Sequence, residues 1–352
     1  MAEATAPKSV LNTEKFVQDI LQSIERDRER EIVARRFGLF DRRETLEQIG
    51  ELLGITRERV RQLEKSVVAR FKASAEQGQL PHIKEAETAL SDQLQHMGNA
   101  ARVSELTTRV TAENSKTDQS RVIFLATLCP RLAVIEEDDN HYQAVGLGNV
   151  RDADAMKVSI AGLVSAIDKI GEPAPIADVA KAAGLENSSE AAALASISKH
   201  LATLNNRWGL VKWPMVNPKN IRDKIYVILK ENGKHMHFNE IAESIKKSEF
   251  KRKDVTTQAI HNELIKDKRF VLIGRGIYAL KEWGYSKGTV ADIITQVLRE
   301  AGEPLHRDEI VKRVLKSRFV KETTILLNLQ GKNQFKRVAK ATYELDEAGN
   351  GA

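Results

Sequence analysis

Apolar positions along this chain follow one pattern that occurs four times. In each copy a stretch of helical periodicity, such as IYVILKENG or ITQVLREAG, ends at a glycine. Seven residues later, an acidic and an aliphatic residue begin a second stretch of the same periodicity. We expect each glycine to end a helix in the left-handed conformation, and each pair to lie in the next helix. The glycines and pairs are Gly98 with Glu105 and Leu106, Gly171 with Asp178 and Val179, Gly233 with Glu240 and Ile241, and Gly302 with Glu309 and Ile310.

An aromatic residue in a short alternating run follows each pair, at Tyr142, Trp208, Tyr278 and Tyr343. Such alternation predicts a β-hairpin. Helix, turn, helix, third helix and hairpin make a winged helix, so the predicted fold class is mainly α with small β-hairpin wings. The predicted domains are an N-terminal amphipathic helix at 1–24, a helix-turn-helix at 25–75, and tandem winged-helix modules at 86–148, 158–215, 219–285 and 289–348.

The segment TLEQIGELLGITRERVRQLEKSVVARF, from Thr45 to Phe71, predicts the helix-turn-helix. Thr45 can cap its first helix with Gln48 as the reciprocal partner, Gly54 permits the turn, and Thr56 can cap the second helix. The residues of the second helix that we expect to face inward are Val60, Leu63, Val67 and Phe71.

The outward positions of this second helix carry side chains that suit base reading. Arg57, Arg61 and Lys65 form one row, and Glu58 and Gln62 form the next. Arginine bonds guanine, glutamate accepts from the cytosine amino group, and glutamine reads adenine edges, so the row suits a major groove. The alternative is a surface helix with charge pairs between successive turns.

Composition indicates which broad class of protein this chain belongs to. The chain has 352 residues, 41% of them hydrophobic and 30% charged, which is typical of a soluble multi-domain protein. No segment approaches the roughly 18 consecutive apolar residues that a membrane helix requires, and we expect the protein to stay in the cytoplasm. With Cys129 as the single cysteine, an internal disulfide and a cysteine zinc cluster are excluded.

Two stretches, TLEQIG at 45–50 and GITRERVRQLE at 54–64, carry a family resemblance. They resemble region 4 of the primary sigma factors of bacterial RNA polymerase, whose second half reads TLEEIG and then GVTRERIRQIE. The resemblance covers about residues 25–72, including the preceding RFGL turn. It implies that Arg57, Glu58 and Gln62 read a promoter −35-like element and that the apolar face beside the RFGL turn grips the polymerase. The sequence departs from the family pattern at Ser66 to Val68, which replace a more basic run, so we expect a lower affinity for the DNA backbone.

Taken together, outward position and resemblance define the candidate site. The predicted base-reading residues are Arg57, Glu58, Arg61 and Gln62. The predicted phosphate contacts are Thr45, Thr56, Arg59 and Lys65.

The third copy of the repeat, at 219–285, has a resemblance of its own. Its segments Phe238 to Ile241 and Phe270 to Leu280 resemble the HARE-HTH domain, a winged helix found in the delta subunit of bacterial RNA polymerase. That resemblance implies the fold and leaves open whether this copy binds DNA or polymerase.

Charge divides the chain into parts with different expected partners. Residues 219–347 hold 27 basic and 18 acidic residues, whereas residues 85–213 hold 12 basic and 17 acidic residues. Clustered lysine and arginine neutralise phosphates, although any single lysine can serve solubility alone. The possible second DNA surface comprises Lys246, Lys247, Lys251, Arg252, Lys253, Gln258, Asn262, Lys266, Arg275, Lys332, Lys336 and Arg337.

Two functions follow from these features. A sigma factor also needs basic and aromatic residues that melt the promoter, and no such block lies ahead of residue 84, where Phe16, Ile20 and Ile24 make one amphipathic stripe. We therefore expect a DNA-binding transcription factor that contacts RNA polymerase and double-stranded DNA without melting it. The alternative is a polymerase accessory subunit, similar to delta, that acts mainly by protein contacts.

Catalytic motifs are absent from the sequence. The eight histidines are scattered, and no HExxH, phosphate loop or serine elbow occurs. We expect no enzymatic activity, no cofactor and no metal site. The acidic run from Glu136 to Asp139 is predicted to be a solvated hairpin turn.

Overall fold

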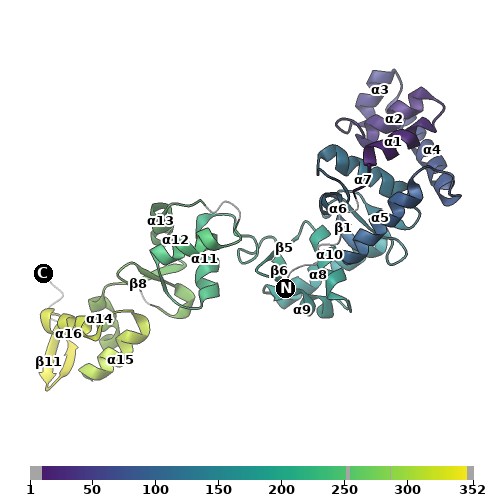
Figure 1. Cartoon of the computed structure of the whole chain (residues 1–352). Coiled ribbons are helices and arrows are strands. Elements are labelled where there is room, and N and C mark those ends of the chain that lie inside the picture. Colours follow the sequence, from purple (N-terminus) through teal and green to yellow (C-terminus); the bar gives the residue numbers. More distant parts are fainter. Residues whose placement is uncertain (1–9, 251–253, 286, 347–352) are drawn as a thin grey trace. The chain divides into compact units, whose positions relative to one another are not determined.

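The computed structural model describes residues 10–250, 254–285 and 287–346. This part of the chain is mostly helical, with four small antiparallel sheets, and it forms two compact units, residues 1–212 and 213–352 (Figure 1). None of the helices in the described part combines the length and the apolar character needed to cross a membrane.

The chain begins with four helices in unit 1. They are α1 (Thr13–Gln22), α2 (Asp27–Phe37), α3 (Leu46–Leu53) and α4 (Arg57–Glu76). The stripe of Phe16, Ile20 and Ile24 is buried, as the periodicity predicts.

Four repeats of one element order follow, two in each unit. Repeat 1 comprises α5 (Ile83–His96), β1 (Ala100–Arg102), α6 (Val103–Val110), α7 (Lys116–Leu128), β2 (Leu132–Ile135) and β3 (Ala144–Leu147). Repeat 2 comprises α8 (Ala153–Ile170), β4 (Ala174–Pro175), α9 (Ile176–Ala182), α10 (Ser188–Ile197), β5 (Leu201–Leu204) and β6 (Arg207–Leu210).

Repeats 3 and 4 have the same order in unit 2. Repeat 3 comprises α11 (Ile221–Asn232), β7 (Met236–His237), α12 (Phe238–Lys247), α13 (Thr257–Lys266), β8 (Phe270–Gly274), β9 (Ile277–Leu280) and the 3-10 turn η1 (Lys281–Trp283). Repeat 4 comprises α14 (Val290–Ala301), β10 (Leu305–His306), α15 (Arg307–Ser317), α16 (Glu322–Gly331), β11 (Phe335–Ala339) and β12 (Thr342–Leu345). In every repeat the third strand is central, as in β1-β3-β2 and β7-β9-β8.

The glycine signals correspond to helix ends. Gly171, Gly233 and Gly302 are left-handed caps of the first helix of repeats 2, 3 and 4. In repeat 1 the helix ends at His96, and Gly98 follows the cap at Met97 with φ +83°. Helices α5 and α8 also begin before the predicted boundaries at 86 and 158, and the division into six domains stays a prediction.

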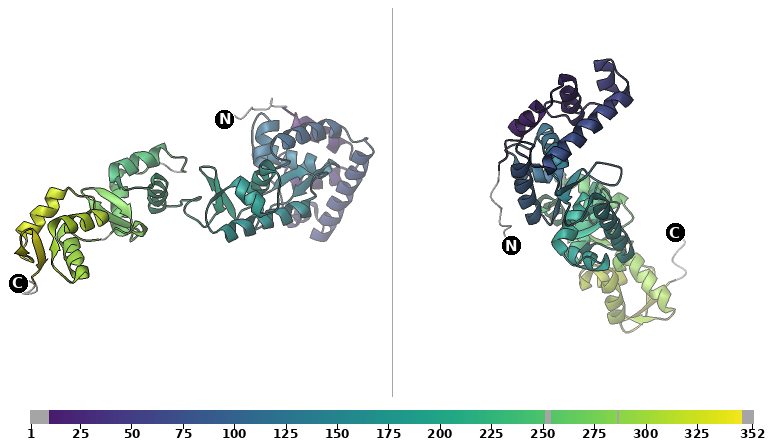
Figure 2. Two further views of the ribbon diagram at one scale, coloured as in Figure 1. Left: turned by 90° about the horizontal axis from the view of Figure 1, so that it is seen from below. Right: turned by 90° about the vertical axis from the view of Figure 1, so that its right-hand side faces the viewer.

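A single hydrophobic core joins the N-terminal helices to repeat 1. It contains residues of α1, α2 and α4 together with α5, α6 and α7, centred on the fully buried Phe124 of α7. The ring of Phe124 packs edge-on against Phe37 of α2, with 5.0 Å between ring centroids, and against Phe71 of α4, at 6.4 Å. The purple and blue helices of this core lie together in both views of Figure 2. The second half of α4 is therefore held by repeat 1.

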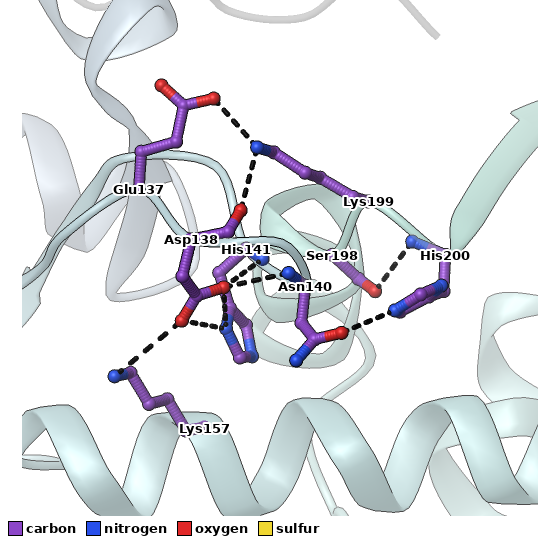
Figure 3. Close-up of polar contacts among 8 residues, drawn as sticks. All are labelled: Glu137, Asp138, Asn140, His141, Lys157, Ser198, Lys199 and His200. Atoms are coloured by element: carbon purple, nitrogen blue, oxygen red, sulfur yellow. Dashed lines mark hydrogen bonds and ion pairs between the residues drawn. The ribbon is translucent and has the colours of Figure 1, made fainter.

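The acidic loop between β2 and β3 agrees with one sequence prediction and corrects another. Residues Glu136 to Asp139 are exposed between the two strands, as predicted for a solvated turn, and some of their side chains also contact repeat 2 (Figure 3). Asp138 accepts hydrogen bonds from the backbone and ring of His141, Lys199 donates to Glu137 at 2.8 Å, and His141 pairs with Ser198 as an isolated β-bridge. Tyr142 lies before β3 rather than within a strand, and its amide donates to the carbonyl of Ile197. Hairpin alternation could not predict this, since the loop's partners come from another repeat.

In unit 2, repeat 4 contacts the sheet of repeat 3. The amide of Phe319, between α15 and α16, donates to the carbonyl of Ile273 in β8 at 3.0 Å. The Phe319 ring packs on His235 at 4.4 Å between centroids, and Arg318 donates to the carbonyls of Leu272 and Gly288. The edge strand β8 is thus partly covered by the neighbouring repeat.

Candidate nucleic-acid interface

Helix α4 presents the predicted base-reading side chains at its first two turns. Its N-cap is Thr56, whose hydroxyl accepts from the Arg59 amide at 3.2 Å. Val60 is fully buried against Ile32 and Ile49, and this fixes the opposite face outward. Glu58, Arg61 and Gln62 are exposed away from Val60, and Arg57 is exposed in the first turn, as the sequence predicts.

A polar network joins three of these four residues in the free chain. Arg61 donates two hydrogen bonds to the Glu58 carboxylate, at 2.7 and 2.8 Å, and Gln62 donates to it at 3.3 Å. The hydrogen bonds from Arg61 lower the pKa of Glu58, so this carboxylate stays ionised. Arg61 uses one edge of its guanidinium on Glu58 and keeps N–H donors on the other edge, so it can bond a base either within this pair or after exchanging it. This pairing is the surface-helix alternative, and an exposed pair of this kind is weak enough to exchange.

Arg57 differs from these neighbours. Within the described residues its side chain makes no hydrogen bond or ion pair, and it lies exposed directly after the Thr56 cap. A guanidinium in the first turn of a recognition helix has all its donors available for the two acceptors of guanine. Arg57 is the side chain best prepared for direct base contact.

The predicted phosphate contacts lie around this face. Thr45 caps α3 in a complete capping box with Gln48, as predicted, and Arg59 and Lys65 are exposed on α4. Capping uses the acceptor capacity of the Thr45 and Thr56 hydroxyls and leaves their protons available to a phosphate. The structure brings these residues together around one surface, and their role in binding stays a prediction.

Gly50 is a residue that positions the two helices of the helix-turn-helix and that the sequence reasoning missed. It lies inside α3, where a Cβ would come within 2.7 Å of the Ile55 carbonyl oxygen. A side chain here would push α3 away from the turn that precedes α4. The available signal was a glycine within an amphipathic helix, six residues before the cap of the second helix at Thr56.

The apolar face beside the RFGL turn is not free, which corrects the prediction that it grips the polymerase. Val33 and Leu39 are fully buried in the shared core, and Phe37 packs on Phe124. Arg121 of α7 also donates to the Leu39 carbonyl at 2.8 Å. Repeat 1 of the same chain occupies this face because α7 presents a continuous apolar surface to it.

The third helix of each repeat is the element that would enter a DNA groove in a winged helix. In α7 no residue from Thr117 to Leu128 is exposed, because α1, α2 and α4 cover it. In α10 only Ser189 is exposed, because β1 of repeat 1 packs on the helix and Arg102 donates to the Ser196 carbonyl. Neither helix can enter a DNA groove while unit 1 is folded.

The third helices of unit 2 are open on one face. In α13 the exposed residues include Gln258, Asn262 and Lys266, as predicted, and Gln258 donates to Asn262 at 3.1 Å. Ile265, 63% exposed, lies on the same helix. In α16 the exposed set is Glu322, Thr323, Leu327, Gln330 and Gly331, without a basic residue.

The remaining residues of the predicted second surface divide between repeats 3 and 4. Lys246 and Lys247 are exposed at the end of α12, and Arg275 is exposed in the turn between β8 and β9. Lys332 follows α16, and Lys336 and Arg337 are exposed on β11. Lys251, Arg252 and Lys253 lie outside the described residues.

The described residues contain no group of three histidine, cysteine or acidic side chains arranged to hold a metal ion. Cys129 is buried, and the lost solvation of its thiolate, with the charge of Glu87 adding to it, raises the pKa of this thiol well above its usual range.

Comparison with known proteins identifies the class of this interface. Residues 26–73 match the family described as Sigma-70, region 4. RNA polymerase sigma factor sigB of Arabidopsis thaliana is 38% identical over 73 residues, which are 20% of this chain and 13% of the relative. RNA polymerase sigma factor SigA of Listeria monocytogenes is 38% identical over 65 residues, 18% of this chain and 17% of the relative, and SigA of Listeria innocua matches equally.

These similarities concern one part of the chain. It spans less than a fifth of the length of the curated relatives it matches, and the matches lie in the helix-turn-helix region. The helix-turn-helix is thus a Sigma-70 region 4 domain, and the domain suggests a sigma-like role in DNA binding.

Proposed function

We propose that this chain is a sigma factor-like transcription protein that reads a promoter −35-like element through α4 and contacts bacterial RNA polymerase in the cytoplasm. The observation that carries the proposal is the exposed set Arg57, Glu58, Arg61 and Gln62 on a helix of a Sigma-70 region 4 domain. Arg57 binds a base edge directly. Glu58 and Arg61 exchange their mutual hydrogen bonds for contacts to bases, and Thr45, Thr56, Arg59 and Lys65 hold the flanking phosphates.

We further propose that the four repeats are winged-helix modules, with repeat 3 of the HARE-HTH kind. Their common order of helix, strand, helix, helix and hairpin supports this assignment. Because α7 and α10 are covered, repeats 1 and 2 serve as the support of the reading domain. A second DNA contact then falls to repeats 3 and 4, through α13 and the basic residues of α12 and β11.

We propose neither promoter melting nor catalysis for this chain. Melting requires aromatic rings free to stack on unpaired bases. Among the described residues, three aromatic side chains are at least a third exposed, and each is in contact with a neighbour. Phe40 lies under Arg121, Tyr142 under Arg102 and Phe319 against His235.

The test is a binding-site selection from random duplex DNA, followed by affinity measurements with the Arg57→Ala variant. We expect the wild type to select a preferred sequence, and Arg57→Ala to lose about 1–3 kcal/mol on it with little loss on unrelated DNA. The matched control is Arg131→Ala, which removes the same charge from a side chain 77% exposed before β2. It should keep the preference. Equal losses of the Arg57 variant on all sequences would refute base reading.

A second experiment tests the surface in unit 2. Changing Lys246 and Lys247 together to alanine should reduce the slope of log affinity against log salt by up to about 1.8, since each lost phosphate contact removes about 0.9. An unchanged slope would assign these lysines to solubility.

One observation favours a second candidate, the polymerase accessory subunit. Helix α16 presents Leu327, 68% exposed, and no basic residue, which suits a protein surface better than DNA. Crosslinking in the cell separates the two. Recovery of polymerase without bound DNA would favour the accessory subunit, and recovery of promoter DNA would favour the first proposal.

A further inference from the structure

A groove lies between the outer face of α4 and repeat 1, beside the candidate base-reading residues. Its volume is about 540 Å³, and its polar lining includes Arg36, Arg43, Arg61, Glu64, Lys65 and Glu136. Four of these side chains are cationic and two are anionic, so the lining is net positive. Val68 adds an apolar floor, and Thr127 of α7 lies on the side of repeat 1.

The position of this groove follows from the dimensions of α4 and DNA. From Arg57 to Lys65 the helix rises roughly 12 Å, at about 1.5 Å per residue. The major groove of DNA is also about 12 Å wide. With Arg57 over the base edges, Lys65 therefore lies at the wall of the major groove, where the phosphates are.

The cations of the groove differ in their availability. Lys65 makes no ion pair among the residues that the structure describes. Arg36 is paired with Glu64 at 3.2 Å, and both side chains are largely buried. Arg43 is paired with Glu136 at 3.8 Å, and both are about half exposed, which makes this pair easy to exchange.

Glu136 comes from the loop between β2 and β3 of repeat 1. Gln143 donates to its carboxylate at 3.3 Å, so a second contact besides Arg43 holds it at the groove. A phosphate entering the groove can take Arg43 from Glu136, but the carboxylate remains nearby and repels it.

We propose that this groove holds the sugar-phosphate backbone of one DNA strand, with Lys65 and Arg43 as phosphate ligands. In this arrangement Glu136 competes with the phosphate for Arg43 and limits the affinity. Repeat 1 thus contributes to DNA binding through its acidic loop, although its third helix is buried. This inference rests on the proposed function of α4.

The test uses the full-length protein and one duplex with the selected sequence, with affinity measured across a range of salt concentrations. Arg43→Gln should lower the slope of log affinity against log salt by about 0.9 and leave the ratio of specific to unspecific affinity unchanged. Glu136→Gln should raise affinity at low salt by about two- to fivefold. The gain should be clearly smaller when Glu136→Gln is made in the Arg43→Gln background, because only the repulsion of the phosphate by Glu136 is then removed; an equal gain would overturn the competition for Arg43.

Asp139→Asn is the matched control, because it removes the same charge from an exposed residue of the same loop. It should change affinity much less than Glu136→Gln. Arg43→Gln could leave the salt slope unchanged while the wild type keeps its base preference and Arg57→Ala loses it. That result would overturn the proposed phosphate binding in the groove and leave the proposed function standing. If the wild type bound all DNA sequences equally well, the proposed function itself would be overturned.

Discussion

The buried ring of Phe124 offers the strongest test of how the reading helix is held. This side chain is 0% exposed and contacts Phe37 and Phe71 in a core shared by α2, α4 and α7. Replacement by alanine removes most of a large side chain from a closed core, for which the typical cost is about 3–5 kcal/mol. The two edge-on ring contacts, each commonly worth about 0.5–1.5 kcal/mol, are part of that cost.

Because one core serves both elements, the loss should appear in α4 as well as in α7. We expect amide hydrogen exchange in both helices of Phe124→Ala to accelerate by at least about a hundredfold, which corresponds to roughly 3 kcal/mol. Exchange in α14 of unit 2 should not change. Hydrogen exchange with mass spectrometry is suitable because a single unfolding free energy is poorly defined for a chain with two units.

Phe40→Ala is the control for this experiment. It removes the same ring from a residue of unit 1 that is 46% exposed and contacts only the guanidinium of Arg121 within the aromatic and cation contacts described. We expect a loss of at most about 1 kcal/mol. If α7 lost protection in Phe124→Ala while α4 kept it, the idea that repeat 1 holds α4 would be wrong.

Three further changes have definite expected outcomes. Thr45→Ala should destabilise α3 by about 1 kcal/mol, because it removes the hydroxyl that accepts from the backbone amide of Gln48 at 3.2 Å. Thr45→Ser keeps a hydroxyl and should retain most of this stability. Equal amide exchange of α3 in the wild type and both variants would contradict the cap. Gly98→Ala should destabilise unit 1 by roughly 1–3 kcal/mol in urea unfolding, since φ is +83° and the new Cβ would lie 2.4 Å from the Ser189 carbonyl oxygen. Gly302 has φ +66° and no atom within 4 Å of a new Cβ, so Gly302→Ala should lose less stability than Gly98→Ala. A larger loss in Gly302→Ala would refute the role of the close approach at Gly98. The hydrogen bond from His141 lowers the pKa of Asp138 to about 2 from the ordinary 3.8, so its stabilisation is present above pH 3.8 and is lost as the pH falls through 2. The protection factor of the Lys199 amide, taken relative to the exchange of an unprotected amide at the same pH, should therefore fall over that interval in the wild type and not in Asp138→Asn. Identical profiles of the two protection factors would show that Asp138 does not hold the loop.

The sequence was most informative where one residue type controls a local conformation. Thr45 and Gln48 form their capping box, and Gly171, Gly233 and Gly302 adopt the left-handed conformation at helix ends. These features depend on a few consecutive residues, so no distant partner had to be known.

Two long-range features had signals in the sequence that were not used. The run VIFLATL in α7 is apolar on every side, and AAALASI in α10 is small and apolar throughout. A helix segment without a polar face is typically buried on all sides, and within these two runs no residue is exposed. Their burial could have been anticipated, but the elements that cover them could not.

The sequence by itself determined the helix-turn-helix, its caps and its outward row of Arg57, Glu58, Arg61 and Gln62, because local periodicity decides which face of a helix is polar. Only the tertiary structure decided what each apolar face packs against. It buried α7 and α10, covered the face beside Phe37 and brought the acidic loop against repeat 2 and the Lys65 groove. Periodicity gives the orientation of a face and carries no information about its partner, since many apolar faces in one chain are chemically alike and only packing distinguishes them.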